Sequence, residues 1–175
     1  MNPTGYRVAA FWVTASNVTF KGFDVINVKE NITTSNNQSI GFAIYGGTSC
    51  TLNNVAVHDG ECVGFYLEGA SASNTFLNCD AYNLTGINSY SYGNADGFGC
   101  HPNASGTGNV YNACRSWNNS DDGYDCLNAA APVTFEYLLV LPERQQRWKW
   151  QRLQSRGLGL DAAEPDSQSP ACTHR

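Results

Sequence analysis

The first 137 residues contain very little positive charge. Up to Tyr137 there are only four Lys or Arg side chains against 11 Asp or Glu, in a chain whose formal net charge is -5. Nucleic-acid binding depends on a basic patch that neutralises phosphates. The composition therefore gives no reason to expect a nucleic-acid partner.

Long apolar runs are also missing. No stretch of 18 apolar residues occurs, so we expect no membrane-spanning segment, and Met1 is not followed by the basic and then apolar pattern of a signal peptide. Secretion cannot be predicted from the N-terminus. Weak support for an extracellular protein comes from six N-x-S/T acceptor sites, although a chain rich in Asn, Ser and Thr contains several by chance: Asn17, Asn31, Asn37, Asn83, Asn103 and Asn118.

The composition changes abruptly after Tyr137. The preceding residues contain 19 Asn and 15 of the 17 Gly, whereas residues 138–175 contain no Asn, two Gly and six of the ten Lys and Arg. Such a break marks a linker, a second domain or a reading-frame error. We expect one folded domain over residues 1–137 and a non-native tail over residues 138–175.

Two short patterns alternate along the first part of the chain. In one, an apolar or small residue recurs at +3 and +5 after an apolar residue, with Asn or Asp at +7; it begins at Phe20, Leu52, Phe76 and Tyr111. In the other, Gly is followed by an aromatic residue, any residue and an apolar one; it begins at Gly5, Gly41, Gly64, Gly97 and Gly123. Strand-length patterns that recur with turns of varying length predict an all-β solenoid, a parallel β-helix. The alternative is a β-sandwich with accidental similarity.

Four carboxylates are expected to gather on one edge of this solenoid. Asp96 and Asp122 each precede the Gly of a Gly-aromatic unit, so they should lie on adjacent coils, with Asp121 and Asp125 nearby. Like charges this close raise each other's pKa unless a cation compensates them. An all-oxygen set suits calcium, although Asp-Asp-Gly alone is more often an ordinary turn.

The segments NADGFGC (94–100) and NVYNACRSWNNSDDGYDC (109–126) closely resemble the family-nine polysaccharide lyases, which are pectate-lyase-like right-handed parallel β-helices. The resemblance extends from about residue 17 to residue 137. It implies that Asp96, Asp121, Asp122 and Asp125 bind one calcium ion. It also implies cleavage of homogalacturonan by β-elimination, in which the metal acidifies the proton on C5 of the uronate and a neutral lysine removes it. We accordingly expect a secreted monomer that binds an acidic plant cell-wall polysaccharide, with no membrane partner.

The lysine that this resemblance implies is missing. Lys149 is the only lysine beyond the acidic cluster, and neither pattern surrounds it. Arg7 shares the predicted column of Asp125 but lies about 19 Å away, and Arg115 is expected to be a solvated outward residue. Reading residues 138 onward one nucleotide later, with permitted codons, restores a Gly- and Asn-rich sequence with a Gly-Phe-Lys-Val unit at positions 152–155. We therefore predict a frameshifted tail in which Gln154 stands where the catalytic lysine belongs.

Two other functions are compatible with these residues. A polygalacturonase-like hydrolase would use the Asp residues as acid and base on a water, although the G-H-G and R-x-K elements of that family are absent. A non-catalytic β-helix would bind calcium and glycan without cleavage.

The remaining side chains allow more than one interpretation. Cys79 shares a column with Cys114, and Cys100 with Cys126, either as core thiols or as disulfides between coils. Cys50 and Cys62 have no column partner, and zinc spacing is absent. His58 and His101 are expected in surface turns. Three aromatic residues are either sugar platforms or packing residues: Trp12, Tyr66 and Trp117.

Overall fold

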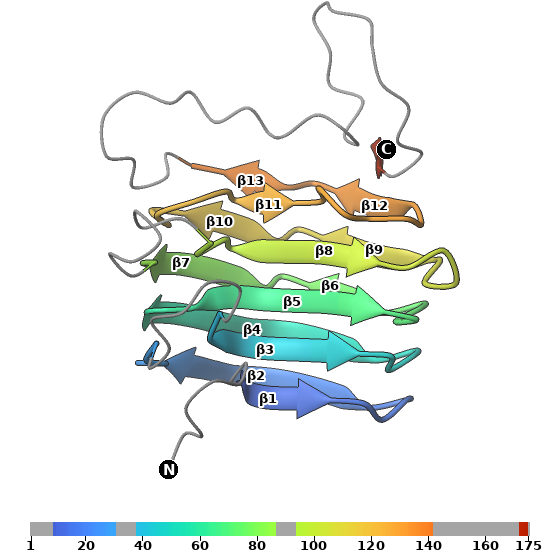
Figure 1. The fold of residues 1–175 in the computed structure, drawn as a ribbon, viewed down its shortest axis with the longest axis horizontal. Helices are drawn as coiled ribbons and strands as arrows, with labels where there is room; N and C mark the ends of the chain where they lie inside the picture. The colour runs from blue at the N-terminus through green and yellow to red at the C-terminus, as the bar shows by residue number, and fades with distance from the viewer. Residues whose placement is uncertain (1–8, 31–37, 87–93, 142–171, 175) are drawn as a thin grey trace, which may run out of the picture.

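The structure is a computed structural model that describes residues 9–30, 38–86, 94–141 and 172–174. Every regular element in these ranges is a β-strand, and Figure 1 shows the strands stacked as successive layers from the N-terminal end upward. The described residues include no helix that is long and apolar enough to cross a membrane. The architecture is a solenoid, in which each coil contacts its neighbours.

The strands form two parallel sheets. Sheet A has the order β1 (Ala9–Val13), β3 (Ile40–Tyr45), β5 (Val63–Gly69), β8 (Phe98–Pro102) and β11 (Tyr124–Asp125). Sheet B contains β2 (Thr19–Ile26), β4 (Thr51–Gly60), β6 (Thr75–Leu77), β7 (Asp80–Leu84), β9 (Asn109–Asn112), β10 (Arg115–Trp117), β12 (Val133–Glu136), β13 (Leu139–Val140) and β14 (Cys172–His174). The long strand β4 pairs with β6 through its first part and with β7 through its last part, so sheet B bends into two faces.

The register confirms the predicted parallel β-helix. In sheet A the aromatic residues of the second pattern form one column, in the order Phe42, Phe65, Phe98 and Tyr124. In sheet B the first pattern aligns in the same way, in the order Phe20, Leu52, Phe76, Tyr111 and Phe135. These side chains point inward and form the core; neighbouring rings such as Phe98 and Tyr124 stack with centroids 4.8 Å apart.

One predicted unit was placed wrongly. Phe11 pairs with Phe42 in sheet A, so the first aromatic of the column is Phe11 and not Tyr6. Trp12 therefore takes the position that the sequence assigned to Arg7, in the column of Asp125. The Gly-aromatic motif is missing at Phe11, where Ala10 replaces the Gly, and this explains the error. Tyr6 and Arg7 lie outside the described residues.

Close backbone approach requires Gly at positions 41, 64 and 97, in three of the Gly-aromatic units. A Cβ on Gly64 would lie 2.4 Å from the carbonyl oxygen of Gly97, and one on Gly97 would lie 2.8 Å from that of Gly123. Real Cβ atoms do not approach oxygen this closely, so a larger residue would displace the next coil. The glycine column thus positions the segments that carry Asp96 and Asp122, each of which directly precedes one of these glycines.

Left-handed turn residues also stack in columns, and this explains the richness in Asn and Gly. Within sheet B, one column of residues with positive φ contains Gly22, Asn54, Asn78, Ala113 and Tyr137, and a second contains Asn27, Asp59, Asn83 and Asn118. Asn, Asp and Gly tolerate this conformation better than other residues do. Each coil therefore repeats these residue types at its turns.

Tyr137 is the residue least suited to its place in these columns. Its φ is 54° and its side chain is 83% exposed, so no packing compensates for the strained backbone. Tyr137→Asn is expected to raise the free energy of unfolding by about 1 kcal/mol, measured by urea denaturation. Tyr137→Phe is the matched control and should change nothing. Equal stability of all three proteins would contradict the strain argument.

The sheets continue past the predicted boundary at residue 137. In the tail that was predicted to be non-native, β13 pairs with β10, and β14 pairs with β12. The reason is that Leu138 and Val140 still stand at +3 and +5 from Phe135, and Leu138 packs partly against the core. Leu139 and Leu141 remain 45% and 43% exposed. Whether residues 138–175 are read in the native frame stays a prediction.

Six cysteines are buried free thiols: Cys50, Cys62, Cys79, Cys100, Cys114 and Cys126. Cys79 and Cys114 do share a column, but both thiols donate to backbone carbonyl groups instead of forming a disulfide. Burial, reinforced by Glu30, raises the pKa of the Cys62 thiol to about 12. The cysteine columns are therefore core thiols and not disulfides between coils.

Candidate metal centre

The acidic residues lie where the chain enters two neighbouring strands of sheet A. Asp96 lies two residues before the start of β8, and Asp122 lies two residues before the start of β11, with one Gly between in each case. The backbone N–H of Gly97 donates to the carbonyl oxygen of Asp122 at 2.9 Å, which extends the parallel ladder to the acids. The backbone N–H of Asp122 donates to Oδ1 of Asp96 at 3.1 Å. The two acids therefore lie beside each other on adjacent coils, as the sequence predicts.

Three carboxylates converge at this point. One oxygen from each of Asp96, Asp121 and Asp122 lies within 4.8 Å of the other two, and in the described part of the chain they form a cluster that could hold a metal ion. Asp121 is oriented by the backbone N–H of Asn94, which donates to its Oδ2. Asp121 and Asp122 are half-buried, whereas Asp96 is only 5% exposed.

Burial makes Asp96 the electrostatic centre of the cluster. Desolvation raises the pKa of Asp96 well above its ordinary value, and the charges of Asp121, Asp125 and Asp122 raise it further. The hydrogen bond from the backbone of Asp122 opposes this shift. A divalent cation would remove the conflict between these carboxylates.

Asp125 lies close to this cluster but turns toward other groups. Its Oδ1 accepts a hydrogen bond from the backbone N–H of Leu127 at 2.8 Å, and its Oδ2 lies 3.5 Å from Nε2 of His101. The cluster of three acids does not include it. Its charge nevertheless reaches Asp96, where it is the second Coulombic contribution to the raised pKa. Its role as a fourth ligand stays a prediction.

Buried polar residues support the cluster from inside the solenoid. The side chain of Asn119 accepts from the backbone N–H of Leu84 at 3.1 Å and donates to Oγ of Ser116 at 2.9 Å. A Cβ on Gly97 would lie 2.3 Å from that same Oγ atom. Asn119 and Ser116 are fully buried, so they hold the turn before β11 against the coil that carries Asp96.

The donor set fits calcium. Calcium takes six to eight oxygen ligands, including carboxylates and waters, and a cluster made only of carboxylates offers hard oxygen donors without sulfur or imidazole. The described Lys and Arg residues lie elsewhere: Lys29 pairs with Glu61 at 3.2 Å, Arg115 pairs with Asp80, and Lys21 lies on β2 of sheet B. The buried charge of Asp96 thus favours a metal partner.

The predicted base cannot be located in the structure. Lys149 and Gln154 lie outside the described residues. Arg115 is an outward residue of β10 in sheet B, as expected, and both its Nε and Nη2 donate to the carboxylate of Asp80. Its expected solvation is only partial, because this ion pair occupies the guanidinium.

The sequence interpretation missed the role of the two histidines. His58 and His101 lie in strands β4 and β8 and not in surface turns, and their side chains are only 15% and 8% exposed. His101 stands beside Asp125, while the ring of His58 stacks on Tyr82. The sequence spacing could have predicted this position. Side chains alternate along a strand, so His101 points outward with Gly99, on the side of Asp125.

Two curated relatives are pectate lyases. Pectate lyase L of Dickeya chrysanthemi is 34% identical over 127 residues, which are 72% of this chain and 27% of that protein. Pectate lyase PEL9 of Emericella nidulans is 41% identical over 70 residues, which are 40% of this chain and 17% of that protein. The chain therefore spans about a quarter or less of the length of these relatives.

Two solved structures share the fold. A rhamnogalacturonan lyase is 39% identical with a TM-score of 0.65, over 75% of this chain and 33% of that one. Pectate lyase Pel9A is 28% identical with a TM-score of 0.63, over 80% of this chain and 32% of that one. The family described as "Pel9A-like, right handed beta helix region" matches residues 2–174. The stacked parallel coils and the match over nearly the whole chain agree, and this protein belongs to the Pel9A-like right-handed β-helix family.

Proposed function

We propose that this chain is the calcium-binding part of a polysaccharide lyase that cleaves homogalacturonan by β-elimination. The observation that carries the proposal is the convergence of Asp96, Asp121 and Asp122, with one oxygen of each within 4.8 Å of the others. The similar proteins support it, since they are pectate lyases and a rhamnogalacturonan lyase.

The geometry favours a metal site over a hydrolytic acid and base. Inverting glycosidases hold their two carboxyl groups about 6.5–9.5 Å apart, because a water must fit between the base and the sugar. The three acids here can approach more closely than that, and the innermost one is buried. Such an arrangement suits a shared cation better than a water. The polygalacturonase-like alternative therefore ranks second.

The residues of this chain would divide the work as follows. Asp96, Asp121 and Asp122 would hold the ion. Asp125 on β11, with His101 beside it, would be the fourth ligand. Bound calcium would neutralise the uronate carboxylate and so acidify the proton on C5. The proton itself requires a base, for which we propose the lysine of the corrected reading frame at the position of Gln154. Of the described lysines, Lys21 lies on β2 and Lys29 pairs with Glu61.

The proposed substrate also determines the proposed location. Homogalacturonan is an acidic polymer of the plant cell wall, so the protein would act outside the cell that makes it. We propose a secreted monomer, in agreement with the acceptor sites for N-glycosylation. One of these, Asn17, lies in an exposed turn.

Calcium is expected to stabilise the folded chain. An ion that binds only the native state at one hundred times its dissociation constant adds about 2.7 kcal/mol to the free energy of unfolding. Titration with calcium should therefore raise the melting temperature, followed by circular dichroism. Asp122→Ala should abolish this rise. Asp24→Ala is the matched control, because Asp24 is 64% exposed on sheet B, and should keep it.

A second measurement separates the candidate functions. β-Elimination creates an unsaturated uronate that absorbs in the ultraviolet, whereas hydrolysis creates only reducing ends. A calcium-binding protein that forms neither product would be a non-catalytic glycan-binding β-helix. An unchanged melting temperature in calcium, or an Asp122→Ala variant that binds calcium as well as the parent, would rule out the metal site.

A further inference from the structure

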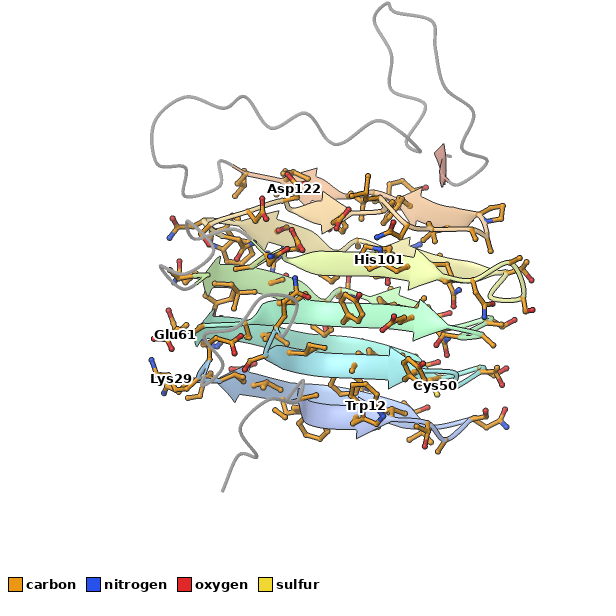
Figure 2. All side chains as sticks on the ribbon, viewed as in Figure 1. Trp12, Lys29, Cys50, Glu61, His101 and Asp122 are labelled. Carbon is orange, nitrogen blue, oxygen red and sulfur yellow. The ribbon has the colours of Figure 1, made fainter. Side chains whose placement is uncertain are left out.

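The outer face of sheet A carries a row of side chains that leads away from the acidic cluster. The register places Trp12, Ala43, Tyr66, Gly99 and Asp125 in one column, with one residue on each coil. Figure 2 shows Trp12, His101 and Asp122 on the side of the molecule that faces the viewer, at successive heights. Coils are about 4.8 Å apart, so the column extends about 19 Å from Asp125 to Trp12.

An aromatic ring covers the part of this column that lies nearest the acidic cluster. A Cβ on Gly99 would lie 2.7 Å from Cδ2 of Tyr66, so the tyrosine ring lies across the glycine. The centroid of that ring is 5.1 Å from that of His101, whose Nε2 lies 3.5 Å from Asp125. An aromatic surface therefore begins directly beside the candidate metal centre.

Two exposed rings lie at the far end of this face: Trp12 ends the column, and Tyr45 lies in the next column, where it pairs with Glu68. Trp12 and Tyr45 stack with their centroids 5.3 Å apart, yet they remain 47% and 46% exposed. The aromatic rings of sheet B differ, because Tyr82 is stacked on both His58 and Trp117 at 4.4 and 4.2 Å. Those rings cover one another. The stacking of Trp12 and Tyr45 fixes their orientation, but it leaves an apolar surface exposed to solvent.

The charge of the outer face of sheet A indicates which kind of sugar it can bind. The outward side chains of the sheet A strands include the carboxylates of Glu68 and Asp125, and no Lys or Arg occurs within strands β1, β3, β5, β8 and β11. Far from the acidic cluster there is thus no cation in these strands to receive a uronate carboxylate. Glu68 would repel one. Rings without a cation match the apolar face of a sugar that carries no charge.

We propose that Trp12 and Tyr45 form a distal saccharide subsite that binds an uncharged sugar, such as a methyl-esterified uronate or a neutral hexose, by stacking. The proposal rests on the proposed function, because it takes the polysaccharide to continue from the metal centre along sheet A. A free carboxylate is then required only at the metal, and the polymer is recognised at the far end by its apolar faces. The favoured polymer is consequently a partly esterified or mixed pectin.

The test is affinity electrophoresis of the full chain in gels that contain highly methyl-esterified homogalacturonan or its de-esterified form. Trp12→Ala and Tyr45→Ala should each weaken binding to the esterified polymer about three- to tenfold. Tyr137→Ala is the matched control, because Tyr137 is an exposed aromatic residue of the sheet B side, and should bind like the parent. Trp12→Phe keeps a ring and should retain most of the affinity, which separates stacking from misfolding.

The metal site is read out separately in the same set of proteins. Trp12→Ala should bind calcium like the parent, and Asp96→Asn should lose calcium while still being retarded by the esterified polymer. If Trp12→Ala and Tyr45→Ala bind the esterified polymer like the parent, or if Asp96→Asn is retarded more by the de-esterified than by the esterified polymer, the distal subsite is overturned while the calcium site stands. If the parent protein does not bind calcium, the proposed function is overturned instead.

Discussion

A chain with the frame-corrected tail, which places a lysine where Gln154 now stands, is expected to cleave polygalacturonate about a hundredfold to ten-thousandfold faster than the chain as written. The acidic cluster can bind a cation and so acidify the C5 proton, but carboxylates held around a metal are poor acceptors for that proton. A neutral amine near a bound cation has its pKa lowered toward neutrality and can act as the base. The initial rate of unsaturated uronate formation measures the difference.

The control for this experiment changes only the base. Replacing the recovered lysine by Ala in the corrected chain should remove turnover and leave the calcium-dependent rise in melting temperature intact. Equal activity of the written and the corrected chains would show that neither the frameshift nor the assignment of the base to the position of Gln154 is right. Genomic sequence across codons 135–160 tests the reading frame directly.

The second large effect is expected for Asp96→Asn, for which the order of melting temperatures of variant and parent should invert between chelator and calcium. In a chelator the variant should melt at a higher temperature than the parent at neutral pH, because it no longer buries a carboxylate among like charges. In saturating calcium the order should invert, because only the parent binds the ion. Thermal melts in both conditions, with Asp24→Asn as the exposed control, measure the crossing.

The pH dependence of the metal-free protein follows from the same residue. The pKa of Asp96 is raised by burial and by neighbouring acids, so its contribution to stability is fully present below the unfolded pKa, about 3.9. That contribution is lost as the pH rises through the folded pKa. Between these limits the melting temperature of the parent should fall with rising pH more steeply than that of Asp96→Asn. Parallel curves would contradict the assignment.

The repeats predicted most of the fold because a solenoid converts sequence spacing into contact. Once Phe42, Phe65, Phe98 and Tyr124 are aligned, the neighbours of every inward residue follow from the register. The same alignment predicts that Asp96 lies next to Asp122, and the hydrogen bond between them confirms it. The Phe11 unit escaped this reasoning because tertiary packing tolerates Ala10 where the motif has Gly.

Side-chain orientation could not be predicted in the same way. Sequence spacing places Asp125 on the correct face, but whether its carboxylate points to Asp96 or to His101 depends on rotamers and on the backbone N–H of Leu127. The hydrogen bonds by which Asn119 holds the turn before β11 could not be predicted either. In a chain with this many asparagines, nothing in the sequence distinguishes the buried one. Local hydrogen bonds therefore decided what periodicity left open.

The number of residues between register-paired positions on successive coils differs from coil to coil, and this determines where the chain can accept insertions. Residues from Phe20 to Asn27 recur as a block of constant size, since Phe20, Phe23 and Val25 pair with Leu52, Val55 and Val57. A single inserted residue there would turn every following side chain to the opposite face. The numbering of Phe42, Phe65, Phe98 and Tyr124 is uneven, so connections outside the block already accept insertions. New sequence can therefore be grafted between the blocks, beside the entry to sheet A that carries Asp96 and Asp122, without shifting the core.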